Sequence, residues 1–93
     1  MESQPFLVEV TEEQIRRERH KARELRQSLW WKRKRVAGIC HHCGGKFLPA
    51  ELTMDHLVPI IRGGKSTKGN LVPSWKQCNS ERKHRLAFEE NAR

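Results

Sequence analysis

The chain has 93 residues, of which 35% are hydrophobic, and its 19 Lys and Arg residues against 11 Asp and Glu residues give a formal charge of +8. A chain of this length forms one small domain with little apolar core, so we expect a metal or a partner to contribute to its stability. The charge favours a nucleic-acid partner, although it would also suit an anionic membrane surface. No apolar run is long enough to span a bilayer.

The N-terminal third is expected to be a short tail followed by a basic helix. Residues 1–10 show no clear periodicity, and we assign them no function. Thr11 and Gln14 have the spacing of a capping box, which predicts that a helix begins there. We predict one long basic helix over residues 11–37, because the apolar residues recur at helical spacing and arginines fill much of the rest. These apolar positions are Ile15, Ala22, Leu25 and Leu29. The charged side could also be only a solvated face with internal Glu–Arg pairs.

Four consecutive cations follow a pair of tryptophans near the end of this predicted helix. Trp30 and Trp31 precede Lys32, Arg33, Lys34 and Arg35. We interpret the four cations as contacts to a nucleic-acid backbone, since Lys and Arg side chains there would release condensed counterions. For the tryptophans, core packing is the better interpretation, and base stacking or wedge insertion is the alternative.

Cysteines at CxxC spacing mark the next segment. Cys40 and Cys43, followed by glycine, are typical of a zinc knuckle, and without an apolar leader they favour thiolates on zinc in a reducing, cytoplasmic compartment over disulfides. Cys78 could be a third ligand. The fourth ligand is open: it could be a histidine or water, or zinc could be absent and Trp75 could fill the space as an apolar plug. The candidate histidines are His41, His42 and His84, and the first two, taken singly, are more often exposed loop residues.

A hairpin and a helix are predicted for the remainder. Residues 53–61 have the β-branched and apolar composition of a strand, residues 62–69 form a Gly-rich loop, and residues 70–72 form a second short strand. After Pro73 the chain should turn, and a helix should run over residues 79–90.

Polar side chains of these three elements are predicted to converge. Asp55 and His56 are adjacent on the first strand, so their side chains should point to opposite faces. Asn79 falls in the first turn of the predicted helix, where it can join them. Taken alone, the Asp55–His56 pair would be better explained as a surface pair on an edge strand; the combination with the loop, the second strand and Asn79 favours a functional site.

The order Asp55-His56, then Asn70, then a cysteine followed by Asn79 resembles the HNH endonucleases, and the resemblance covers about residues 40–85. It implies a small α+β protein with a ββα-metal (His-Me finger) nuclease core and a CxxC knuckle, preceded here by the long basic helix. It also implies His56 as general base, Asp55 and Asn79 as ligands of one divalent metal, and Asn70 as the residue that braces the loop and the histidine. Where the family has the first cysteine of a second CxxC, this chain has Trp75.

The implied activity is metal-dependent hydrolysis of phosphodiester bonds in double-stranded DNA. Oxygen ligands suit Mg²⁺ or Mn²⁺, and zinc at the cysteines would be structural. One metal site should cut one strand, so a monomer should nick DNA, and a double-strand break would need a homodimer or repeated nicking. Further backbone contacts are expected from the last helix, at Arg82, Lys83 and Arg85, unless these only form a solvated face.

Three parts of the chain follow from these predictions: a tail over residues 1–10, a basic helix over residues 11–37 and a nuclease domain over residues 38–93. The rival function is a catalytically silent zinc-ribbon module that binds nucleic acid through the basic helix. A basic helix on a membrane surface ranks below both.

Overall fold

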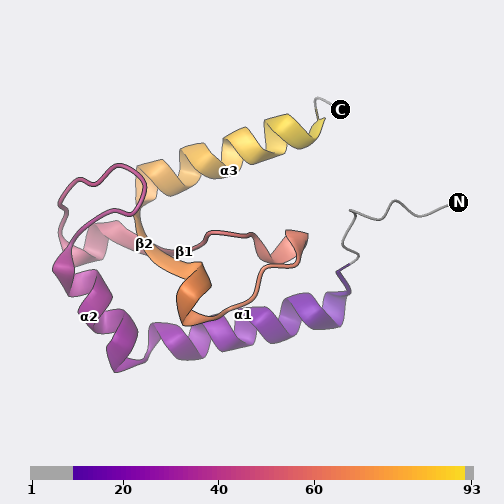
Figure 1. Cartoon of the computed structure of the whole chain (residues 1–93), viewed down its shortest axis with the longest axis horizontal. Helices are drawn as coiled ribbons and strands as arrows, with labels where there is room; N and C mark the ends of the chain where they lie inside the picture. Colours follow the sequence, from indigo (N-terminus) through magenta and orange to yellow (C-terminus); the bar gives the residue numbers. More distant parts are fainter. Residues whose placement is uncertain (1–9, 92–93) are drawn as a thin grey trace, which may run out of the picture.

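The computed structural model describes residues 10–91, with side chains described as far as Lys83. Two helices, α1 (Glu12–Arg26) and α2 (Leu29–Ala37), precede a two-stranded antiparallel sheet of β1 (Leu52–His56) and β2 (Leu71–Trp75), and helix α3 (Lys76–Asn91) follows. In Figure 1 the sheet lies between α1 and α3. Single turns of 3-10 helix occur at Pro49–Glu51, Ile60–Arg62 and Lys68–Asn70. The α+β class and the strand–strand–helix order are confirmed; nearly all of the predicted tail lies outside the described residues.

The predicted basic helix is two helices, so the expectation of one continuous helix was wrong. The predicted start is confirmed, because the Thr11 side chain accepts from the backbone N–H of Gln14 and the Gln14 side chain accepts from that of Thr11. The break occurs at Ser28. Its hydroxyl donates to the carbonyl of Leu25 at 2.6 Å and accepts from the backbone N–H of Trp31 at 3.3 Å. Ser28 is thus the N-cap of α2, and its hydroxyl also bonds the last turn of α1. The chain changes direction at this serine, so α2 does not continue along the axis of α1 (Figure 1).

The strands also differ from the prediction in their bounds. The first strand ends at His56 instead of Ile61, because the backbone N–H of Val58 donates to the side chain of Asn70 at 2.8 Å and Pro59 has no N–H to offer. The second strand continues through Pro73, opposite Met54, to its end two residues later, so the turn predicted after Pro73 is absent. A proline is tolerated there because β2 pairs with a single neighbouring strand. Helix α3 therefore begins earlier than predicted and keeps Asn79 in its first turn, as expected.

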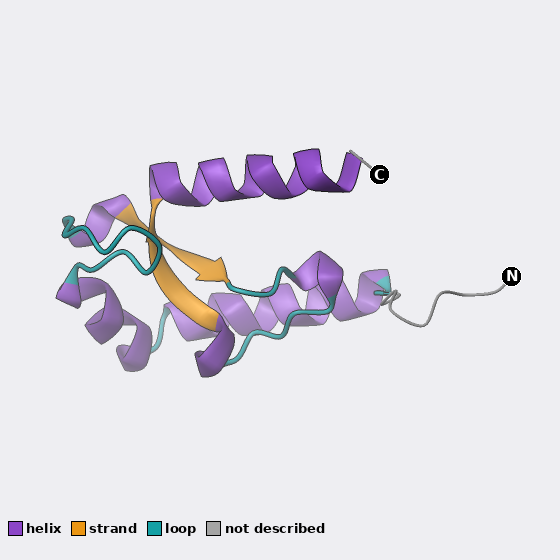
Figure 2. Ribbon diagram, turned by 45° about the horizontal axis from the view of Figure 1, so that its top comes forward, coloured by secondary structure: helices purple, strands orange, loops and turns teal. Residues whose placement is uncertain are grey.

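The core is small, and its buried apolar residues come from the N-terminal helices, from Cys40 and from both strands. Figure 2 shows the strands between α3 and these helices. Trp31 is 1% exposed and Leu71 is completely buried, which confirms the core interpretation for the second tryptophan. Trp30 is half-buried instead, with the ammonium groups of Lys34 and Lys68 each 5.7 Å from the centre of its ring. Leu29, expected on the packing face, is exposed. In the part of the chain that the structure describes, no helix is long and apolar enough to cross a membrane.

The loop between the strands folds tightly onto itself. The backbone N–H of Gly64 donates to the carbonyl of Pro59 at 2.9 Å, and a Cβ at position 64 would lie only 1.7 Å from the carbonyl oxygen of Val58. Only glycine fits this close approach of backbone to backbone. The glycines that the sequence shows in this loop therefore keep it compact beside the end of β1.

Candidate active site

A cleft of about 430 Å³ opens beside the end of β1, between α1 and α3. It is lined by Arg19, Met54, Asp55, His56, Pro59, Ile60, Ile61, Arg62, Arg82 and Lys83. The predicted Asp–His pair therefore shares one concave surface with cations from both long helices. Arg19 is a member of this surface that the sequence did not single out.

Asp55 is buried, and its carboxylate is contacted by two basic side chains. Its side chain is 4% exposed, which excludes the surface-pair interpretation. The guanidinium of Arg82 donates from one nitrogen to both carboxylate oxygens, at 3.1 and 3.2 Å, and the Nε2 of His42 lies 2.7 Å from Oδ2. A buried carboxylate needs such compensation, since an unpaired charge in the interior is costly.

Arg82 and His42 thus make contacts to Asp55 that the sequence did not indicate. We predicted Arg82 as a contact to the nucleic-acid backbone or as part of a solvated face, but it also donates to the backbone carbonyls of His56 and Leu57, and its side chain is only 22% exposed. His42 is an exposed loop residue, as expected, and it also connects the CxxC turn to Asp55. Both contacts join distant segments, 27 and 13 residues apart in the chain, and no local spacing rule indicates them.

Asn79 faces β1 from the first turn of α3. Its amide nitrogen donates to the hydroxyl of Thr53 at 3.0 Å, and that hydroxyl donates its single proton to the carbonyl of Ser74 at 3.1 Å. The amide is therefore oriented with Oδ1 on its other side, where this buried oxygen has no hydrogen-bond partner among the described residues. Thr53 and Asp55 share one face of β1, and Asn79 and Arg82 share one face of α3. An unpartnered buried amide oxygen on α3 and the carboxylate of Asp55, which contacts Arg82 of the same helix, are hard oxygen donors that fit a divalent cation.

His56 points away from Asp55, as the alternation of a strand predicts. Its Nε2 lies 2.9 Å from the hydroxyl of Ser66, while Asp55 faces α3. Burial lowers the pKa of His56 below its ordinary value of 6.5, and the negative charges of Asp55 and Glu18 oppose this shift. The lowered pKa favours a neutral imidazole at cellular pH, which is the form that can accept a proton.

Asn70 connects the two ends of the loop between the strands. Its side chain accepts from the backbone N–H of Val58 at 2.8 Å and donates to the carbonyls of Val58 and Lys65, at 3.1 and 2.8 Å. Its own carbonyl accepts from the N–H of Leu57 at 2.9 Å. Asn70 thus fixes the backbone directly after His56.

Glu18 is a buried charge that sequence reasoning missed. It is 4% exposed, and one carboxylate oxygen accepts from the backbone N–H of Ser66 at 2.6 Å. That hydrogen bond lowers the pKa of Glu18, with burial opposing it and Lys21 adding to it. A signal was available: Glu18 lies in the same helical stripe as Ile15 and Ala22, where a carboxylate needs a buried partner.

Replacing Glu18 by glutamine should therefore lower stability in a pH-dependent way. Because the folded-state pKa of Glu18 lies below its ordinary value of 4.5, its contribution is fully present above that value and is lost as the pH falls through the folded-state pKa. At pH 7 we expect a loss of about 2 kcal/mol in the free energy of unfolding, as for a hydrogen bond to a charged group. Below about pH 4 the difference in the free energy of unfolding between wild type and Glu18→Gln should become smaller.

Urea unfolding at several pH values measures this difference. The matched control is Glu24→Gln, since Glu24 is an exposed carboxylate of the same helix that pairs with exposed His20 and such pairs contribute little. A stability difference for Glu18→Gln that does not change between pH 7 and pH 4 would contradict the assignment.

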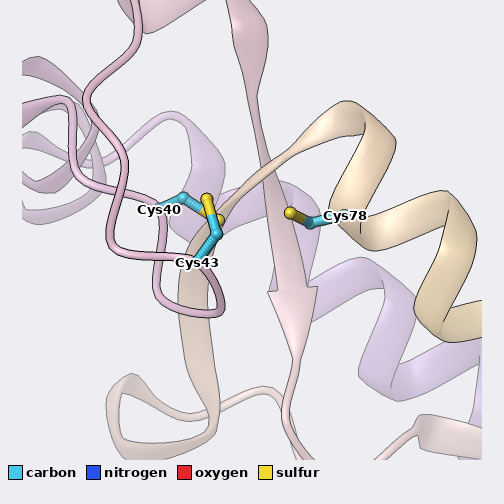
Figure 3. A group of neighbouring side chains, drawn as sticks. All are labelled: Cys40, Cys43 and Cys78. Atoms are coloured by element: carbon cyan, nitrogen blue, oxygen red, sulfur yellow. The ribbon is translucent and has the colours of Figure 1, made fainter.

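The three cysteines form one cluster. Their sulfur atoms all lie within 4.8 Å of one another, Cys40 and Cys43 on the turn after α2 and Cys78 on α3 (Figure 3). Burial would raise the pKa of Cys40, but backbone N–H groups around it, including that of Trp75 at 3.3 Å, lower it to about 6. Burial and hydrogen bonding to the other two thiols raise the pKa of Cys78 to about 11. The cluster therefore stabilises one thiolate by itself and could hold zinc with three sulfur ligands.

The structure does not bring a fourth ligand to the cysteines from the described His, Asp and Glu side chains. The indole of Trp75 stacks on Phe47 with 4.6 Å between ring centres and 16° between planes. Among the described side chains, no histidine joins the cysteine cluster, and His42 lies against Asp55. The side chains of His84 and of Arg85 are outside the described residues.

Comparison with known families gives one match. Residues 40–85 match the family model described as HNH endonuclease. This range contains the cysteine cluster, both strands and the start of α3, and it excludes α1 and α2. No curated protein matches the chain.

Proposed function

We propose, on the premise that the chain belongs to the HNH endonuclease family through residues 40–85, that it is a DNA endonuclease which nicks one strand per binding event. The family consists of nucleases that hydrolyse phosphodiester bonds with a divalent metal, so a nucleic-acid substrate follows from membership. The observation that carries the proposal is the cleft in which Asp55 and His56 lie beside Arg19 and Lys83. A substrate phosphate in this cleft would meet a base, a carboxylate and cations together.

In this proposal His56 is the general base. A neutral imidazole on the cleft wall can take a proton from the water that attacks phosphorus, in line with the leaving oxygen. Asn70 contributes by holding the backbone after His56, which keeps the ring in place. Arg19 and Lys83 attract the phosphate backbone into the cleft, because both are cations on its wall.

Asp55 and Asn79 are the residues that would hold a divalent ion, with Mg²⁺ or Mn²⁺ favoured by their oxygen atoms. Such an ion, when bound, stabilises negative charge on the phosphate and on the leaving oxygen. The positive charge of Arg82 compensates the negative charge of Asp55. Arg82 also orients the carboxylate, since one guanidinium nitrogen contacts both carboxylate oxygens. One carboxylate and one amide give a weakly charged site, so we expect metal binding to strengthen with substrate present.

The basic segment of α2 is the proposed contact to DNA outside the cleft. Lys32, Arg33, Lys34 and Arg35 are all exposed. Replacing all four by alanine should weaken binding to every DNA sequence alike, because phosphate contacts carry no sequence information. The slope of log affinity against log salt concentration should become shallower by up to about 3.6, which is four contacts at 0.9 each.

Fluorescence anisotropy at several salt concentrations measures this slope. The matched control replaces Arg33 and Arg35 by lysine, which keeps the charge and should leave the slope unchanged. An unchanged slope in the alanine variant would remove the segment from the interface.

Incubation of the purified protein with supercoiled plasmid and Mg²⁺ or Mn²⁺ tests the function directly. We expect open-circular DNA to accumulate before linear DNA, and no product with chelator in place of metal. Binding without cleavage under every metal condition would instead favour a silent zinc-ribbon module. Simultaneous appearance of linear DNA would contradict cleavage of one strand per event.

A further inference from the structure

Ser66, in the loop between the strands, connects α1 to the proposed base. Its hydroxyl lies 2.6 Å from the backbone carbonyl oxygen of Glu18 and 2.9 Å from the Nε2 of His56. Its backbone N–H donates to the carboxylate of Glu18 at 2.6 Å. Ser66 is 5% exposed, so water has little access to this connection. Glu18 thus holds Ser66 at two points, and Ser66 contacts the ring of His56.

The hydrogen bonds determine where the ring carries its proton. A serine hydroxyl has a single hydrogen, and a carbonyl oxygen can only accept, so at 2.6 Å the hydroxyl of Ser66 must donate to Glu18. The same hydroxyl can then only accept from the imidazole, which requires a proton on the Nε2 of His56. In the neutral ring the lone pair is therefore on Nδ1. This nitrogen makes no hydrogen bond with any of the described residues, and His56 lines the cleft.

We propose that Ser66, held by Glu18, is a positioning residue that fixes the tautomer of His56, with the proton on Nε2 and the basic lone pair on Nδ1. The assignment of the tautomer depends only on the hydrogen-bond geometry, whereas its consequence for catalysis depends on the proposed function. Without the serine hydroxyl, either ring nitrogen could carry the proton and the fraction of His56 with a basic Nδ1 would fall. Since Glu18 lies in α1, this helix becomes part of the active site although it is outside the residues that match the family.

The tautomer can be observed without any nuclease assay. In protein labelled with ¹⁵N at histidine and kept metal-free at about pH 8, above the ordinary histidine pKa of about 6.5, the ¹⁵N shifts of a ring show which nitrogen carries the proton. The His56 signals are identified by their absence in His56→Gln. We expect a single tautomer with the proton on Nε2 in wild type, a mixture in Ser66→Ala, and restoration of the wild-type tautomer in Ser66→Thr.

The matched control is Thr67→Ala, which removes an exposed hydroxyl from the neighbouring position. It should leave the His56 signals and the cleavage rate unchanged. For Ser66→Ala we expect kcat to fall on the order of 10-fold to 100-fold, as for other residues that orient a functional histidine. DNA affinity and the concentration of metal needed should stay at wild-type values.

Two results would overturn the proposal: wild-type His56 with its proton on Nδ1, or a Ser66→Ala variant that keeps the single wild-type tautomer. If Ser66→Ala does not fold, as judged by circular dichroism, Ser66→Gly replaces it, because glycine also removes the hydroxyl, and a single wild-type tautomer in that variant would reject the proposal in the same way. Failure of the proposed function gives a different pattern. In that case the tautomer depends on Ser66 as expected, but wild type cleaves no DNA.

Discussion

Replacing His56 by alanine should lower the rate of DNA cleavage on the order of 10²-fold to 10⁴-fold, the range for loss of a general base. DNA affinity should change little, because the base acts on water and the phosphate contacts come from other side chains. Single-turnover nicking of supercoiled plasmid measures the cleavage rate, and fluorescence anisotropy measures the DNA affinity. The matched control is His20→Ala, since His20 is exposed on α1 and its side chain contacts only Glu24 among the described residues.

The same assay separates the base from the proposed metal ligands. Asp55→Ala and Asn79→Ala should raise the concentration of Mg²⁺ or Mn²⁺ needed for half-maximal activity, whereas no amount of metal should restore His56→Ala. Cleavage at the wild-type rate by His56→Ala would reject this residue as the base. Activity with an unaltered metal requirement in both of the other variants would remove Asp55 and Asn79 from the ligand set.

Removing zinc from the cysteine cluster should cost the protein much of its stability. The three sulfur atoms connect the turn after α2 to α3, and the apolar core beside them is small. Because a structural zinc contributes its binding free energy to folding, on the order of 10 kcal/mol in small zinc domains, the metal-free chain should melt far below the zinc-bound chain. Elemental analysis should give one zinc per chain, and thermal unfolding with and without a chelator gives the shift in Tm.

Cys78→Ser is the variant that checks this account. It should melt near the chelated wild-type protein, and chelator should have no further effect on it. Equal melting temperatures for wild type with and without chelator, together with no zinc by elemental analysis, would show that the cluster is a set of free thiols.

Trp75→Cys addresses the fourth zinc ligand. In the structure the indole stacks on Phe47, so we expect a lower Tm from the lost aromatic contact, with zinc content unchanged. In that case water or a side chain outside the described residues completes the site. A raised Tm in zinc would instead show that position 75 is where the fourth ligand is missing.

Much of the fold follows from short-range rules. A capping box needs only Thr11 and Gln14, three residues apart, and a CxxC turn needs only Cys40 and Cys43. Alternation along a strand was enough to send Asp55 and His56 to opposite sides. These features depend on backbone geometry within a few residues, and for this reason the sequence by itself indicates them.

Element bounds were less predictable because they depend on competing partners. The composition from residue 53 to residue 61 suits a strand, but the side chain of Asn70 takes the backbone N–H of Val58 and ends the pairing. The helical periodicity before residue 37 suits one helix. At residue 28, however, the hydroxyl of Ser28 hydrogen-bonds the carbonyl of Leu25 and the N–H of Trp31, and these bonds replace those of a continuous helix.

The contacts that make the site were decided only by the tertiary structure. Arg82 turns inward because Asp55 is buried and needs a cation, and Ser66 reaches His56 because α1 packs beside a loop 48 residues away in the chain. The sequence by itself determined which side chains could carry the chemistry. Packing determined which of them meet, because the pairing of buried polar groups depends on three-dimensional neighbours that residue spacing does not encode.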